Sequence, residues 1–271
     1  MGKKVFVIDV ARCTGCYNCQ LVCKDEHVGN DWSPYAKPQP PTGQFWCKVE
    51  DHVCGTIPKV KIHYISKLCN HCENAPCIAA AKNGAVYRRD DGLVIIDPEK
   101  AAGQKQIADA CPYGAIYWNT ELGIPQKCTG CAHLLDNGAA LPRCAEACPT
   151  DALRFGDEEE LADLVKGAEV LQPETGCKPR VYYRNIPGQF IGATLYDPQE
   201  EEVVIGATCR LNCGAKVWST VSDEFGDFWF RDLPVGKFDL VIECPGYATK
   251  TFTGLDTTQC VNLGDIPLEK A

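Results

Sequence analysis

Long apolar runs are missing from this 271-residue sequence. The best candidate, residues 93–96, is far shorter than the roughly 18 residues that a membrane helix needs. At the N-terminus, two lysines precede an apolar run that stops at Asp9, which is too short for the core of a signal peptide. The sequence therefore predicts no membrane insertion and, by default, a cytoplasmic location. Export in the folded state on a signal-bearing partner is the alternative.

Basic residues are in deficit, because 27 Lys and Arg stand against 36 Asp and Glu, for a formal net charge of -9. A nucleic-acid-binding surface needs the opposite sign, so no nucleic acid is expected as a partner. The sequence also lacks a paired nucleophile and base, a phosphate-binding loop and an open metal site. Bond-making chemistry is therefore expected on another subunit, and no catalytic residue is assigned to this chain.

Methionine occurs once, whereas cysteine occurs 19 times. So many thiols must be disulfides or metal ligands, and clustered cysteines in a reducing compartment more often bind metal. Fourteen of them lie between Cys13 and Cys148, and twelve of those fall in closely spaced groups. Residues 1–156 are therefore predicted to form one metal-binding domain.

The first cysteine group, C-x2-C-x2-C-x3-C, runs from residue 13 to residue 23, and the last, C-x2-C-x12-C-x3-C-P, from residue 128 to residue 149. In bacterial ferredoxins with such spacing, three cysteines hold one 4Fe-4S cluster and the fourth reaches over to a second cluster. A zinc site would use only two cysteines per knuckle. Exchange of the fourth ligands predicts Cys13, Cys16, Cys19 and Cys148 for cluster 1, and Cys23, Cys128, Cys131 and Cys144 for cluster 2.

The middle of the chain repeats this logic only in part. A C-x2-C-x4-C group supplies three ligands, and a Cys-Pro pair some thirty residues later supplies the reach-over ligand. The predicted ligands of cluster 3 are Cys69, Cys72, Cys77 and Cys111.

These groups resemble the ferredoxin-type iron–sulfur subunits that accompany molybdopterin enzymes of the dimethyl sulfoxide reductase family. That family pattern has four clusters, and this sequence resembles it with one cluster deleted. The four positions at which the resemblance implies cysteine are occupied by Ala81, Ala101, Gln104 and Ile107. Because these are the four ligands of a single cluster, three complete 4Fe-4S clusters are expected.

The motifs VIDVARC, CKDEH, CNHCENAPC, NGAVY, DPEK, QKCTGCAHLLD and KPRVYYRN most closely resemble those of aryl transhydroxylase small subunits. The resemblance implies electron transfer to a large catalytic subunit, in a heterodimer or larger complex. That partner would carry a molybdenum or tungsten bis-pterin guanine dinucleotide cofactor and transfer or remove aryl hydroxyl groups. The iron–sulfur subunit of a reductive catechol dehydroxylase, a resorcinol hydroxylase or another oxidoreductase of that family is the alternative. A structural role, with zinc or inert clusters, is a third reading.

The C-terminal part of the sequence has a different character. Helical spacing of apolar residues predicts an amphipathic helix over residues 157–171, followed by an extended linker to residue 188. Beyond it, residues 189–271 alternate between apolar and polar positions, and the run SDEFGDFWFRDLPVGKFDLVIECPGY resembles carboxypeptidase-regulatory or prealbumin-like β-sandwiches. The predicted fold class is α+β, with a ferredoxin-like domain followed by a small all-β sandwich. That sandwich is expected to cap the large subunit, or else to contact a further protein.

Seven cysteines lie outside the ferredoxin-type groups, and their roles are not assigned: Cys47, Cys54, Cys177, Cys209, Cys213, Cys244 and Cys260. The pair Cys209-x3-Cys213 has no third and fourth ligand nearby, so free thiols are expected there. His71 and His133 fall inside cluster loops. We expect them to donate hydrogen bonds that tune cluster potentials, and not to replace cysteine ligands.

Overall fold

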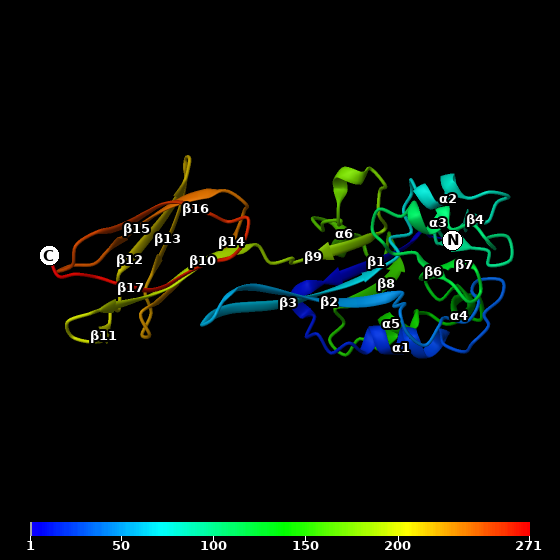
Figure 1. Ribbon diagram of the computed structural model, residues 1–271, viewed down its shortest axis with the longest axis horizontal. Coiled ribbons are helices and arrows are strands. Elements are labelled where there is room, and N and C mark those ends of the chain that lie inside the picture. The colour runs from blue at the N-terminus through cyan, green and yellow to red at the C-terminus, as the bar shows by residue number, and fades with distance from the viewer. Residues whose placement is uncertain (1) are drawn as a thin grey trace. The chain divides into compact units, whose positions relative to one another are not determined.

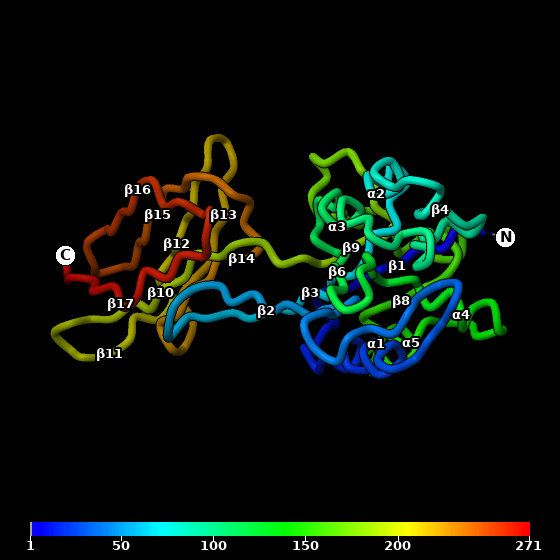
Figure 2. Tube along the Cα trace, turned by 45° about the vertical axis from the view of Figure 1, so that its right-hand side comes forward, coloured from blue at the N-terminus to red at the C-terminus, as the bar shows by residue number. Residues whose placement is uncertain are grey.

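The computed structural model describes residues 2–271, which fall into two units (Figures 1 and 2). The first unit comprises residues up to 51 and residues 63–186, and the second comprises residues 52–62 and 187–271. Residues 52–62 thus belong with the C-terminal part, although the sequence alone assigns them to the metal-binding domain. None of the helices in the described residues is long and apolar enough to cross a membrane.

A three-stranded sheet lies at the centre of the first unit, in the order β8-β1-β9. Its middle strand β1 (Lys4–Asp9) buries four consecutive apolar residues, as expected of a strand covered on both faces. It pairs antiparallel with β8 (Leu153–Asp157) and parallel with β9 (Val181–Arg184). The two ends of the metal-binding region therefore meet in one sheet.

Three hairpins complete the strands of the first unit. The short pairs are β4 (Val86–Arg88) with β5 (Val94–Ile96), and β6 (Tyr117–Asn119) with β7 (Ile124–Gln126). The long pair is β2 (Cys47–Thr56) with β3 (Lys59–Leu68), whose tip belongs to the second unit. The sequence analysis does not predict the long hairpin.

The helices of the first unit are short, as expected where metal-binding loops occupy much of the chain. In chain order they are η1 (Val10–Arg12), α1 (Asn18–His27), α2 (Pro76–Ala80), α3 (Gln106–Asp109), α4 (Ala132–Asp136), α5 (Arg143–Glu146), α6 (Ala162–Val165) and η2 (Pro173–Thr175). The helix predicted over residues 157–171 is wrong in length, because only α6 forms there. Asp157 belongs to β8, α6 buries no side chain, and Gly167 adopts a left-handed conformation just beyond it.

The second unit consists of two four-stranded sheets (Figure 1). In one, β10 (Gln189–Asp197) pairs with β11 (Glu202–Val203), β14 (Asp227–Leu233) and β17 (Val261–Pro267). The other has the order β13 (Lys216–Val221), β12 (Thr208–Cys213), β15 (Lys237–Glu243) and β16 (Lys250–Asp256). Alternate residues of β14 and β15 are buried, including Phe228, Phe230, Phe238, Leu240 and Ile242. The predicted α+β class with an all-β C-terminal part is confirmed.

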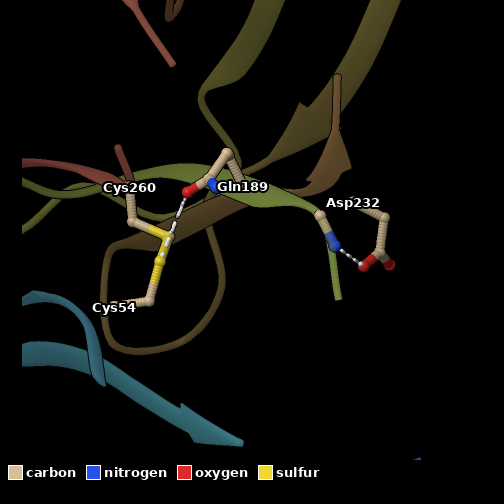
Figure 3. The surroundings of a disulfide bond; sticks show 5 residues. Cys54, Gln189, Asp232 and Cys260 are labelled. Carbon is tan, nitrogen blue, oxygen red and sulfur yellow. Dashed lines mark hydrogen bonds between the residues drawn. A yellow bond between two sulfur atoms is a disulfide. The ribbon is translucent and has the colours of Figure 1, made fainter. Parts of the chain in front are cut away.

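A disulfide joins Cys54, near the tip of the long hairpin, to Cys260, just before β17 (Figure 3). Both residues belong to the second unit, and the bond spans 206 residues of sequence. The amide oxygen of Gln189 lies 3.1 Å from Cys260 Sγ. The bond links residues 52–62 covalently to the β-sheet unit. From the sequence alone, no role was assigned to either cysteine.

Candidate iron–sulfur sites

The three C-x2-C loops share one backbone conformation. The residue before the second cysteine is left-handed in each loop, with φ of 66° at Gly15, 44° at His71 and 65° at Gly130. At Gly130 this conformation aims the backbone N–H at Cys128 Sγ, 3.3 Å away. Glycine adopts such a φ without steric cost, which accounts for the Cys-Thr-Gly-Cys motif in the first and last loops.

The first site gathers the four cysteines predicted for cluster 1. Its cavity is lined by Cys13, Cys16, Cys19 and Cys148, together with apolar side chains such as Ile8 and Leu153. Cys148 reaches this cavity from the loop after α5. Burial raises the pKa of the Cys13 thiol, and the neighbouring cysteines raise it further. Four mutually repelling thiolates in one apolar cavity are favourable only around a cationic core.

The second site gathers the cysteines predicted for cluster 2. Burial raises the pKa of Cys23 well above its usual range, and Cys128, Cys144 and Cys131 add to this effect because they surround it. Helix α1 therefore carries Cys19 for the first site and Cys23 for the second, one turn apart. In the same way, α5 carries Cys144 for the second site, and Cys148, just after this helix, lies in the first site.

The third site has the cysteines predicted for cluster 3. Its cavity is lined by Cys69, Cys72, Cys77 and Cys111, with His71, Val94 and Ile116 among the other lining residues. Burial raises the pKa of Cys77 to about 11. All twelve cysteines that the sequence predicts as ligands are thus gathered into three sets of four.

His71 tests whether a cluster fits the third cavity. Its Nδ1 accepts a hydrogen bond from the Val94 N–H at 3.0 Å, so the neutral ring carries its proton on Nε2. That Nε2 is buried and has no partner within the described residues. A buried N–H without an acceptor costs about 1–3 kcal/mol. The sulfurs of a 4Fe-4S cluster would provide the missing acceptor, so the residues fit this cofactor.

His133 differs from the expectation in its contacts. Its Nε2 lies 3.0 Å from Glu26 Oε1, so this nitrogen faces a carboxylate. Its Nδ1 is buried and lacks a partner within the described residues.

No group of three His, Cys, Asp or Glu side chains in the described part of the chain is arranged to hold a single metal ion. Four sulfurs around one tetrahedral zinc stand about 3.8 Å apart, given Zn–S bonds of about 2.3 Å. In a 4Fe-4S cluster each cysteine binds a different iron, so its ligands stand further apart.

The four positions that lack the cysteines of a fourth cluster are close together and filled. Ala101 and Ile107 are fully buried in an apolar cluster with Val86 and Ile96, and Ala81 packs against that cluster. Gln104 accepts a hydrogen bond from the Lys82 N–H at 2.8 Å and donates one to the Lys100 carbonyl at 2.7 Å. Apolar packing and one buried amide therefore occupy the place that the resemblance assigns to a cluster.

Cys47 lies between the first and second sites, a position that the sequence does not indicate. Its thiol is buried at the start of β2, and Cys144 of the second site and Cys19 of the first, together with burial, raise its pKa well above the usual range. Hydrogen bonding from Cys47 lowers the pKa of Cys19. Because Cys47 lies outside any group of cysteines in the sequence, no spacing signal could have indicated this position.

The remaining cysteines have ordinary surroundings. Cys209 is fully buried in the core of the second unit, and Cys213 and Cys244 pack at its margin as free thiols, as expected. Cys177 is buried near the third site, where its sulfur adds to the burial that raises the pKa of Cys72.

Three four-cysteine sites, the first two of which exchange their fourth cysteine, define the class of protein, a ferredoxin-type iron–sulfur protein. Residues 60–158 match the 4Fe-4S dicluster domain family, and residues 191–268 match the carboxypeptidase regulatory-like domain family. The chain belongs to the iron–sulfur electron-transfer subunits of dimethyl sulfoxide reductase-type molybdopterin oxidoreductases. The predicted family is therefore confirmed.

Among relatives, the pyrogallol hydroxytransferase small subunit of Pelobacter acidigallici is 40% identical over 99% of this chain and 100% of that protein. A sulfite dehydrogenase subunit of Allochromatium vinosum is 34% identical over 68% of this chain and 83% of that protein. A probable anaerobic dimethyl sulfoxide reductase chain of Escherichia coli is 36% identical over 58% of this chain and 74% of that protein. A solved 5-hydroxyisourate hydrolase of Klebsiella pneumoniae is 16% identical over 31% of this chain and 93% of that chain, with a TM-score of 0.23, too low to bear on function.

Proposed function

We propose that this chain holds three 4Fe-4S clusters and transfers electrons to or from a larger molybdopterin-containing subunit. The observation that carries the proposal is the three sets of four cysteines, eleven of them buried or half-buried, with the unpartnered N–H of His71 in the third cavity. The ligands are those predicted from the sequence. When bound, the clusters would supply one-electron transfer between the partner and an external donor or acceptor.

The residues between the sites support an ordered relay. Cys144 of the second site and Cys19 of the first both raise the pKa of Cys47, and Cys69 of the third site is close enough to Cys128 of the second to raise its pKa. Only Cys16 of the twelve is exposed, so apolar side chains exclude water from most of the relay. These interactions support a relay in which electrons pass along the first, second and third sites in that order.

For the partner, we propose a large subunit with a molybdenum or tungsten bis-pterin cofactor, in a heterodimer or larger complex. Full-length similarity to the pyrogallol hydroxytransferase small subunit favours a pyrogallol–phloroglucinol transhydroxylase-like reaction, in which aryl hydroxyl groups are transferred. Reductive catechol dehydroxylation and resorcinol hydroxylation are the related possibilities. Similarity to subunits named for sulfite and dimethyl sulfoxide keeps a different oxidoreductase of the family as the second candidate.

For the compartment, two proposals compete. The many free, clustered thiols favour the reducing cytoplasm, where cysteines more often bind metal than form disulfides. The Cys54–Cys260 disulfide favours export on a signal-bearing partner, because stable disulfides are typical of oxidising compartments (Figure 3). Cell fractionation with alkylation of free thiols at lysis separates the two proposals.

We propose that the second unit packs against the large subunit, in preference to a further protein. The test is deletion of residues 189–271 together with Cys54→Ser, which avoids an orphaned thiol. A heterodimer that forms at full strength without the unit would contradict the proposal.

The function is tested on the native complex, purified without oxygen. About twelve irons per chain, molybdenum or tungsten, and activity on pyrogallol or catechols are expected. Cys111→Ser should lower the iron content to about eight, whereas Cys209→Ser, which changes a buried thiol of the second unit, should not. Clusters without a large partner would leave a free electron carrier and contradict the proposal.

A further inference from the structure

Lys127 is a buried cation beside two of the candidate sites. It follows β7 directly, precedes Cys128, and is only 2% exposed. Its Nζ donates one hydrogen bond to the Val94 carbonyl and another, at 3.0 Å, to the Cys128 carbonyl. Both acceptors are neutral, so they satisfy the donors of the ammonium without balancing its charge.

The other buried cations of the described chain are paired with carboxylates. Lys59, 3% exposed, contacts Asp227 at 2.6 Å, and Arg180, equally buried, contacts Glu73 and Glu158. No ion pair joins Lys127 to a carboxylate among the described residues. A buried charge without a counter-charge costs several kcal/mol, so a negative group is expected within reach of Lys127.

The two carbonyls that accept hydrogen bonds from Lys127 belong to different sites, because Val94 lines the third cavity and Cys128 is part of the second site. Burial raises the pKa of Cys77 and of Cys111 in the third site, and in both cases the Lys127 charge opposes the shift. The same holds for Cys128 of the second site. Lys127 therefore lies between the second and third sites, close enough for its charge to act on cysteines of both.

We propose that Lys127 is the internal counter-ion of the second and third clusters and raises the reduction potential of both. The inference rests on the proposed cluster sites. A fixed positive charge favours the reduced cluster, which is the more negative state, and low dielectric surroundings strengthen that effect. Through its charge, Lys127 thus influences electron transfer between the second and third clusters. A purely structural role, tying β5 to the loop after β7 through two carbonyls, would not act on potential.

Three variants separate charge from hydrogen bonding: Lys127→Met removes both, Lys127→Gln keeps a donor without charge, and Lys127→Arg keeps the charge. The native complex of each is titrated potentiometrically, with electron paramagnetic resonance as the readout. Lower potentials for two of the three clusters are expected in the Met and Gln variants. The remaining cluster should be unchanged, and arginine should restore wild-type values. Lys59→Met, which removes a buried lysine of the second unit, should leave all three potentials unchanged.

Unchanged potentials in a fully loaded Met variant, or wild-type potentials in the Gln variant, would overturn the inference. If clusters are lost in the Met and Gln variants but retained in the Arg variant, the charge is needed for assembly, which supports the inference. Loss of clusters in all three variants would overturn the inference and indicate that Lys127 has only a structural role. Iron analysis of the wild type keeps this test separate, because a chain without clusters refutes the proposed function instead.

Discussion

At the scale of single residues, the loop of the third site has Asn70 and His71 where the other two loops have threonine and glycine. Gly15 and Gly130 have no side chain there, whereas His71 adopts a similar left-handed φ and adds a ring. A left-handed histidine is uncommon, so the surroundings must stabilise it. The Val94 N–H holds the ring, and its Nε2–H is left for the cluster cavity.

His71→Asn is expected to lower the reduction potential of one cluster. Asparagine tolerates the left-handed φ and its oxygen can take the Val94 N–H, but its amide does not reach the position of Nε2. His71→Gln is longer and should restore part of the potential. Redox titration checks this, with the other two clusters as internal controls. Equal potentials in wild type and His71→Asn would show that Nε2 does not contact the cluster.

His27 should make stability depend on pH. The ring is buried against Trp46, and burial, with a further contribution from His133, lowers its pKa from 6.5 to about 4. Between those values the unfolded chain binds more protons than the folded chain. Stability should therefore fall as pH decreases from 6.5 towards 4, by at most about 1.4 kcal/mol per pH unit.

The matched variant is His27→Gln, which should flatten this dependence. The melting temperature of both proteins is measured without oxygen at about pH 5.5 and about pH 7.5, on either side of the ordinary histidine pKa. Parallel profiles for the two proteins would mean that His27 is not the titrating group.

At the scale of elements, the segment from α2 to α3 shows how a cluster can be replaced. Ala81 follows α2, Ile107 lies in α3, and Gln104 joins the two elements through hydrogen bonds. Four cysteine ligands would tie these elements through iron. Here, methyl groups and one amide do so by packing and hydrogen bonding.

Gln104→Ala should destabilise this segment by about 1–3 kcal/mol, because it removes the buried amide that accepts a hydrogen bond from the Lys82 N–H and donates one to the Lys100 carbonyl. Lys105→Ala is the control, since Lys105 is exposed on the same segment. Thermal unfolding and hydrogen exchange of residues 81–107 give the comparison. Equal protection in the two variants would show that apolar packing alone holds the segment.

At the scale of the whole molecule, two kinds of cross-link act on different units. The first unit depends on cysteines gathered around clusters, whereas the second has a β-sheet core with one disulfide. The long hairpin of β2 and β3 starts in the first unit and has its tip in the second.

Cys54→Ser with Cys260→Ser should lower the unfolding temperature of the second unit, because the bond constrains a very long loop of the unfolded chain. Engineered and native bonds of this kind contribute about 2–4 kcal/mol. The cluster spectra should not change, and Cys213→Ser should leave both readouts as in the wild type. Calorimetry with alkylation and mass analysis tests this. Two additional alkylated cysteines in the untreated wild type would show that the bond does not form.

The sequence by itself determined the family and the β-rich C-terminal unit, and it predicted the cysteine sets and three clusters in place of four. This was possible because cluster ligands come from short loops, so a local spacing specifies the chemistry, and because β alternation is likewise local. The helix over residues 157–171 was overestimated, since apolar spacing does not say whether a face becomes buried.

Only the tertiary structure decided the remaining features. The Cys54–Cys260 bond, the Cys47 contacts, the ring orientation of His71 and the burial of Lys127 each join residues from separate elements. A side chain's neighbours across such elements depend on how the whole chain packs, and no pattern within a short stretch of sequence carries that information.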